Sequence, residues 1–235
     1  MPAKRTLICG GAPQCCAGQL LRSLRRCVLL AVAAAVPFST QPAHAQQPVN
    51  PEQAPIESEF ALEGGSSVGN IHVFAYADDR SIYPFGVEYD RHSWGGVVGA
   101  RVDYVTELLP VVLLNEPAKY DQSSKALTTA RQIEYGAGFS PIGVRLLWRR
   151  DKAIKPYLMG KGGILYFENR VLSSKATHLN FSAQFGGGVE ARLTPRLELR
   201  LGYTDFHFSN GDIVARNPGI DFMYINTGVA YRFGK

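Results

Sequence analysis

The chain has 235 residues, of which 46% are hydrophobic, and it carries four cysteines and a formal net charge of +5. All four cysteines and five basic residues lie within residues 1–45, which contain no acidic residue. The rest of the chain has no cysteine and equal numbers of basic and acidic residues, twenty of each. A chain without residues 1–45 is therefore neutral. This excludes disulfides, cysteine metal sites and a thiol nucleophile, and it removes the reason to expect a nucleic-acid partner.

Residues 1–45 have the organisation of a secretory signal peptide. Arginines precede a nine-residue apolar run at 28–36, and the segment ends in Ala43-His44-Ala45. A basic region, a short apolar core and a small-residue cleavage site direct export through the Sec pathway. The apolar run is too short to cross a bilayer, which takes roughly 20 residues. We therefore expect cleavage before Gln46 rather than a membrane anchor.

Residues 46–57 are polar and rich in proline, which predicts a periplasmic linker, and residues 58–235 predict a single all-β domain. Within this domain apolar and polar residues alternate with a period of two, as they do in strands with two different faces. The parity of the apolar residues changes across Ser140 and Pro141, which predicts a β-bulge there. The predicted strands cover residues 58–67, 82–91, 96–108, 132–148, 156–167, 178–193, 197–209 and 221–233.

Two kinds of fold show this alternation. A soluble barrel or sandwich buries its apolar face, whereas a transmembrane barrel turns that face to lipid and fills its interior with polar and small residues. Here the polar faces combine acids, bases and glycines, for example Glu190 with Arg192, which suits a narrow interior with ion pairs. Tyrosine and tryptophan also lie near strand ends, as in an interfacial girdle. We therefore predict an eight-stranded antiparallel transmembrane β-barrel of the Gram-negative outer membrane, with short periplasmic turns and long external loops.

Polar residues interrupt the lipid-facing side of the strand predicted at 197–209. Four apolar residues on this face are followed by Asp205, His207 and Ser209 toward the outer end. Asp221 lies on the same face of the next strand, and an antiparallel hairpin brings it close to His207 and Ser209. An imidazole that takes the serine proton, with a carboxylate to orient it, is the arrangement of an acyl-transfer site. Its place near the outer leaflet predicts lipopolysaccharide as the substrate, with acyl chains along the apolar wall.

The segment His207-Phe208-Ser209-Asn210-Gly211, followed by Asn217-Pro218-Gly219-Ile220-Asp221, resembles the signature of the PagL-type lipid A 3-O-deacylases, the acyloxyacyl hydrolase-like outer-membrane proteins. The resemblance implies an eight-stranded outer-membrane barrel whose site lies on the lipid-facing surface. It implies hydrolysis of the ester-linked 3-O-acyl chain of lipid A without a metal or other cofactor. Ser209 is then the nucleophile, His207 the general base and Asp221 the acid. Backbone amides at Asn210 and Gly211 then form the oxyanion hole, and Asn217 supports the site.

Two residues depart from the family signature. Asp221 stands where the family has a glutamate and is one methylene shorter, so its reach to His207 depends on the strand register. Asp205, on the same face two residues before the histidine, is the alternative acid. Asp212 stands where the family has a glycine. It has less conformational freedom than glycine, and it places a carboxylate near the developing oxyanion.

Two alternatives stay open. A non-catalytic outer-membrane barrel with a structural or adhesive role would use residues 207–221 only to anchor a loop. A soluble ligand-binding barrel would stay in the periplasm. The partners expected are lipopolysaccharide, through its lipid A, and the surrounding outer-membrane lipid, and a homodimer stays open as the assembly state.

Overall fold

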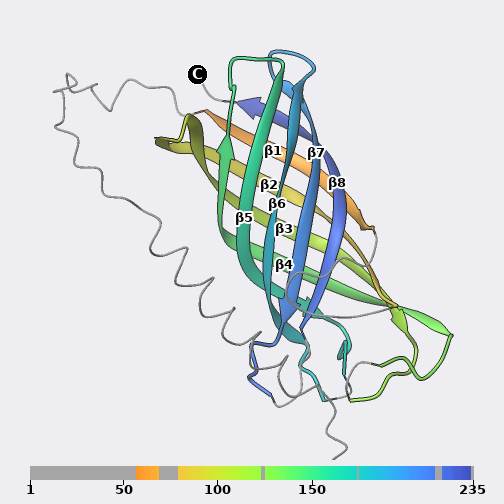
Figure 1. Cartoon of the computed structure of the whole chain (residues 1–235). Helices are drawn as coiled ribbons and strands as arrows, with labels where there is room; N and C mark the ends of the chain where they lie inside the picture. Colours follow the sequence, from red (N-terminus) through yellow and green to blue (C-terminus); the bar gives the residue numbers. More distant parts are fainter. Residues whose placement is uncertain (1–56, 69–78, 123–124, 174, 215–218, 234–235) are drawn as a thin grey trace, which may run out of the picture. The chain divides into compact units, whose positions relative to one another are not determined.

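Eight β-strands follow one another along the part of the chain that the computed structural model describes, residues 57–68, 79–122, 125–173, 175–214 and 219–233 (Figure 1). The expected signal peptide and all but the last residue of the expected linker lie outside these ranges. None of the described residues forms a helix long and apolar enough to cross a membrane. The strands are β1 (Ser58–Ser67), β2 (Ser81–Val97), β3 (Ala100–Pro117), β4 (Arg131–Leu147), β5 (Ile154–Phe167), β6 (Leu179–Arg192), β7 (Leu197–Ser209) and β8 (Ile220–Phe233).

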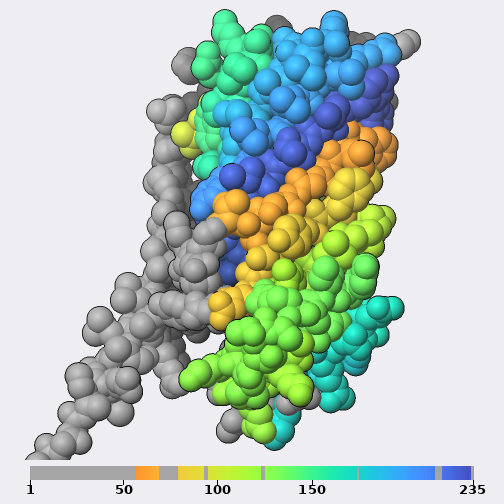
Figure 2. All heavy atoms as spheres, turned by 90° about the vertical axis from the view of Figure 1, so that its right-hand side faces the viewer, coloured from red at the N-terminus to blue at the C-terminus, as the bar shows by residue number. Residues whose placement is uncertain are grey.

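The strands form a closed barrel in which each one pairs antiparallel with the next in the chain. The barrel closes between β1 and β8, which pair over ten residues from Ser58 opposite Phe233 to Ser67 opposite Tyr224. Figure 2 shows this closure from the outside, with β8, β1 and β2 running diagonally side by side in dark blue, orange and yellow. The prediction of an eight-stranded antiparallel barrel is confirmed.

Side chains alternate between the two faces of the wall as the sequence predicts. In β6, Phe181 and Phe185 are 49% and 68% exposed, whereas Gln184 and Glu190 are buried. The leucines of β7 likewise lie outside, and Arg200 between them is buried. The hydrophobic residues therefore form an outer wall, which is the arrangement that a membrane barrel presents to lipid.

Buried ion pairs fill the interior toward the short turns. Arg200 of β7 lies 2.8 Å from Glu59 of β1, 2.8 Å from Glu88 of β2 and 3.2 Å from Glu190 of β6. Arg145 of β4 also pairs with Glu59 and Glu190, at 3.3 and 2.7 Å. A charge away from water is costly unless it is paired. These contacts therefore stabilise the arrangement of the five strands that carry them, β1, β2, β4, β6 and β7.

Toward the long loops a layer of apolar side chains fills much of the interior, beside the buried Arg80–Glu116 ion pair. Phe206 and Phe208 of β7 are almost fully buried there, and Phe208 stacks on Phe222 of β8 with ring centroids 6.0 Å apart. The residues of this apolar layer come from β2, β3, β5, β7, β8 and the loop after β5: Ile82, Leu109, Val112, Leu114, Leu165, Phe167, Val171, Leu172, Phe206, Phe208, Ile220, Phe222 and Tyr224. The interior is thus mainly charged toward the short turns and mainly apolar toward the long loops.

Strands β2 and β3 are longer than the sequence predicts. The tight turn expected near 92–95 lies instead at Val98 and Gly99, with φ angles of 49° and 72°. Two residues with positive φ are what a two-residue hairpin turn requires. Strand β3 also continues past Pro110, because its pairing with β4 shifts between Leu109 and Val112, and a bulge tolerates a residue that lacks an N–H.

The bulge predicted at Ser140 and Pro141 is confirmed. The pairing of β4 with β5 shifts between Phe139 and Ile142, which passes over these two residues. The short turns lie at one end of the barrel, together with the start of β1 and the end of β8. The four longer connections lie at the other end (Figure 1). Strand β7 runs toward the end with the longer connections, which in outer-membrane barrels is the end that faces outward.

We expect Arg200→Met to lower the free energy of unfolding by about 3–5 kcal/mol, because several buried carboxylates lose their shared counter-charge. Urea unfolding of the protein refolded in lipid vesicles measures this. Arg196→Ala removes the same charge from the exposed turn before β7 and should cost less than about 0.5 kcal/mol. An Arg200→Met protein as stable as the wild type would contradict this account of the interior.

Candidate active site

The outer end of β7 reverses the usual arrangement of the wall. Asp205, His207 and Ser209 lie on its outer face, while Phe206 and Phe208 point inward into the apolar layer. The two phenylalanines are 1% and 0% exposed. Because they are buried among other rings, they fix the strand at the positions that carry the polar side chains. The polar residues therefore project from a firmly packed strand rather than from a loop.

The β7–β8 hairpin places Asp221 directly opposite His207. The Nδ1 atom of His207 and the Oδ1 atom of Asp221 are 2.5 Å apart. Asp221 is 1% exposed, and the histidine side chain is 24% exposed. Directly paired residues have Cβ atoms about 5 Å apart, so the shorter aspartate spans the gap. The question of reach that the sequence raised is answered by the register.

The loop after Ser209 turns its amides back toward the serine. The N–H of Gly211 points to Oγ of Ser209 at 3.4 Å, and the N–H of Asp212 donates to Oδ1 of Asn210 at 3.0 Å. Gly211 and Asp212 have φ angles of 65° and 60°. Asp212 thus adopts the left-handed conformation itself, which aspartate tolerates better than most residues. Asn217, the other residue expected to support the site, lies outside the described residues.

Asp205, the alternative acid, lies on the same face as His207 but one step further from the loop. It is 5% exposed, and its partners in the register are Phe185 of β6 and Met223 of β8. The carboxylate within hydrogen-bond distance of His207 Nδ1 is that of Asp221. The geometry therefore favours Asp221 as the residue that orients the imidazole.

Gly219 is a further residue at this place, to which the sequence analysis assigned no role. A Cβ atom at this position would contact both His207 and Ser209. The hairpin pairing could have pointed to it, because continuing the pairs from His207–Asp221 sets Gly219 opposite Ser209.

An apolar wall borders the polar residues on its β6 side. Phe181, Ala183 and Phe185 lie opposite Ser209, His207 and Asp205, in that order. Further along the wall toward the short turns, Leu201, Tyr203 and Ile225 are 51%, 43% and 46% exposed. A reacting group held at Ser209 would thus lie at the edge of a surface that accepts hydrocarbon chains.

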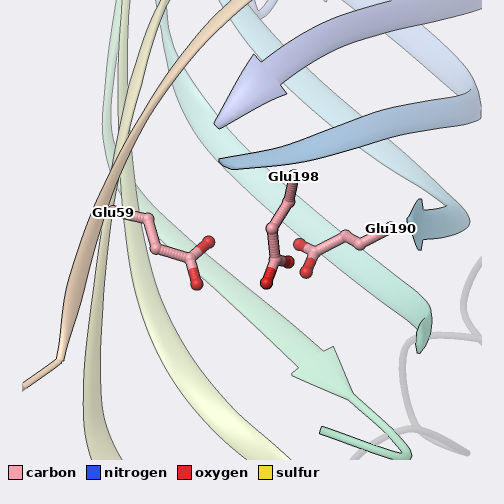
Figure 3. Close-up of side chains that lie close together, drawn as sticks. All are labelled: Glu59, Glu190 and Glu198. Atoms are coloured by element: carbon pink, nitrogen blue, oxygen red, sulfur yellow. The ribbon is translucent and has the colours of Figure 1, made fainter. Parts of the chain in front are cut away.

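Three carboxylates in the interior lie close enough to hold a metal ion, namely those of Glu59, Glu190 and Glu198 (Figure 3). Cationic side chains of the protein already neutralise these carboxylates, however. The Nζ atom of Lys155 is 3.0 Å from Glu190 and contacts Glu198, and Arg200 lies 2.8 Å from Glu59. The cluster is therefore part of the ion-pair network, and its donor set does not fit a resident metal.

A cavity of about 410 Å³ opens at the short-turn end of the barrel. It is far from Ser209 along the strands and is lined by charged side chains that largely pair with one another. Arg101, for example, lies 2.8 Å from Asp103 and 3.5 Å from Glu57. Its lining residues are Glu57, His92, Arg101, Arg150, Asp151, Arg192 and Arg232.

Comparison with known proteins identifies one family. The family described as Lipid A 3-O-deacylase (PagL) matches residues 98–230. This range includes the polar residues of the outer face, Asp205, His207, Ser209 and Asp221. The crystal structure of the outer membrane enzyme PagL superposes with a TM-score of 0.52 and 14% identity, over 73% of this chain and 97% of that one. The attachment invasion locus protein Ail of Yersinia pestis gives a TM-score of 0.42 and 11% identity, over 76% and 99%. No curated protein sequence matches the chain.

We expect chelation to leave the barrel unchanged, because ammonium and guanidinium groups already neutralise Glu59, Glu190 and Glu198. The measurement is the urea midpoint of refolded protein with EDTA, and again with added Ca²⁺ or Zn²⁺. Lys155→Met, which removes the ammonium between two of the carboxylates, is the comparison variant. A midpoint of the wild type that rises with either ion would contradict this assignment.

Proposed function

Because the chain belongs to the lipid A 3-O-deacylase (PagL) family, whose activity is that of an ester hydrolase, we propose that it removes the 3-O-acyl chain of lipid A through a triad of Ser209, His207 and Asp221. The observation that carries this proposal is the contact between His207 Nδ1 and Asp221 on the outer wall, beside Ser209. The family and the barrel place the protein in the outer membrane. In this reading, residues 1–45 are the cleaved Sec signal and residues 46–57 the linker.

The carboxylate of Asp221 accepts a hydrogen bond from Nδ1–H of His207, which leaves the lone pair of the neutral imidazole on Nε2. Nε2 takes the proton of the Ser209 hydroxyl as Oγ attacks the ester carbonyl carbon. The resulting imidazolium, stabilised by Asp221, then gives that proton to the departing sugar oxygen. The sugar leaves with a free 3-hydroxyl, and the acyl chain stays on Ser209 as an ester.

Water completes the cycle. His207 takes a proton from the attacking water and returns it to Oγ of Ser209, so that the products are the deacylated lipid and a free fatty acid. Negative charge develops on the carbonyl oxygen in both steps and needs donors in place beforehand. The amides that begin at Asn210 and Gly211 supply them in this proposal, and Asn217 supports the loop. The N–H of Gly211 already points toward Oγ of Ser209.

The location of the triad defines how the substrate approaches. His207 and Ser209 face outward at the long-loop end, where the outer leaflet presents lipid A. The acyl chains extend down the wall past Phe185, Tyr203 and Leu201, which are exposed to lipid. Apolar contact with this wall aligns the ester with Ser209 without a closed pocket.

Ser209→Ala should abolish deacylation, because no other group supplies the nucleophile. Mass spectra of lipid A from cells that express the wild type should show the loss of one 3-hydroxyacyl chain, and spectra with Ser209→Ala should not. Ser66→Ala changes another serine exposed on the outer face of β1 and serves as the control. Identical spectra with and without the wild-type protein would favour a non-catalytic barrel with a structural or adhesive role.

Asp221→Asn should lower kcat by on the order of 10³–10⁴, because an amide at this position favours the wrong tautomer of His207. Asp205→Asn should stay within a few-fold of the wild type. The measurement is the initial rate of fatty-acid release from purified lipid A in detergent. If Asp205→Asn were inactive while Asp221→Asn kept its rate, the acid would be wrongly assigned.

A further inference from the structure

Gly219 stands at the entrance of β8, one residue before the first pair of the β7–β8 ladder. That pair is Phe208 with Ile220, and the next step of the same register sets Gly219 opposite Ser209. Residues two apart in a strand share a face, so position 219 is on the outer face together with Asp221. A side chain at 219 would stand beside Ser209 and diagonally next to His207.

That place is already occupied by the imidazole ring. A Cβ built on Gly219 would lie 2.8 Å from Cε1 of His207, 3.3 Å from its Nε2 and 3.1 Å from Cβ of Ser209. Carbon atoms in contact are normally about 3.5–4.0 Å apart. The ring therefore lies against the α-carbon of Gly219, in the space that the side chain of any other residue would fill.

We propose that Gly219 is a positioning residue for His207, an inference that rests on the proposed function. The ring is held at two points. Asp221 binds Nδ1 at 2.5 Å, and the backbone of Gly219 supports the neighbouring edge of the ring, which carries Cε1 and Nε2. A single hydrogen bond at Nδ1 would leave the ring free to swing about that bond. The second contact restricts the direction in which Nε2 points, and the proposed function needs that direction to be toward Ser209, two residues further along β7.

Gly219→Ala tests this inference. The added methyl group must push the ring several tenths of an ångström away from position 219, and misplacement of a reacting group by about 1 Å costs on the order of 10²-fold in rate. We expect kcat on lipid A to fall about 10–100-fold while KM changes less than about three-fold, because the apolar wall is untouched. Labelling of Ser209 by a fluorophosphonate, which needs the serine and histidine but not lipid binding, should slow by the same factor.

Gly228→Ala is the matched control. It lies in the same strand, and its Cβ would meet Cγ of Glu63 at 2.6 Å and the carbonyl oxygen of Leu62 at 2.7 Å. It should therefore lower the urea midpoint without lowering kcat of the folded fraction. An equal loss of kcat in both variants would overturn the inference, since it would report only damage to the barrel. A rise in KM with unchanged kcat in Gly219→Ala would overturn it as well.

A measurement on the wild type covers the case in which Gly219→Ala does not fold. In detergent micelles, the Hε1 proton of His207 should give a strong nuclear Overhauser effect to the α-protons of Gly219, and its absence would overturn the inference. The two proposals also fail differently. An active wild type, an inactive Ser209→Ala and a fully active Gly219→Ala would overturn the role of Gly219 alone. A wild type without deacylase activity would overturn the proposed function, and the positioning role with it.

Discussion

The buried ion pairs around Arg145 and Arg200 determine which face is inside for the strands that carry them. Their carboxylate partners come from β1, β2, β3 and β6, so the contacts cross the interior rather than run along one strand. Because none of these charges can leave the interior without a large cost, the intervening residues are committed to the outer wall. The apolar residues of β6 and β7 therefore face outward. His207 and Ser209 lie on the same outward face of β7.

The candidate site depends on where this charged filling ends. Toward the long loops, Phe206, Phe208 and Phe222 fill the interior beneath the β7–β8 hairpin, while the buried Arg80–Glu116 ion pair lies at the same end of the barrel. Polar side chains can then occupy the wall while the rings beneath them fix the hairpin. The rings beneath the hairpin thus hold the two strands that carry the His207–Asp221 pair, at 2.5 Å, on the outer face.

The alternation of apolar and polar residues predicted correctly which side chains face outward and which face the interior. It did not predict the register between neighbouring strands. The bounds of β1 and β7 and the bulge at Pro141 followed from parity alone. The extension of β3 past Pro110 did not, because a bulge interrupts parity in the same way as a strand end does. Parity also placed Asp221 and His207 on one face but could not say that they are direct partners, since register depends on the conformation of the loop between them. Gly219 is part of the signature segment, but no role could be assigned to it from the sequence, because its contacts exist only in the folded hairpin.

The stacking of Phe208 on Phe222 has a consequence for how the chain can change over generations. These rings and the His207–Asp221 pair alternate along the same two strands, one set on each face of a single hairpin. Any exchange of an inner ring for a smaller or larger one shifts the spacing of the outer pair, although lipid never reaches the inner side. Residues inside the barrel can therefore influence the geometry of the His207–Asp221 pair, although they do not face the membrane.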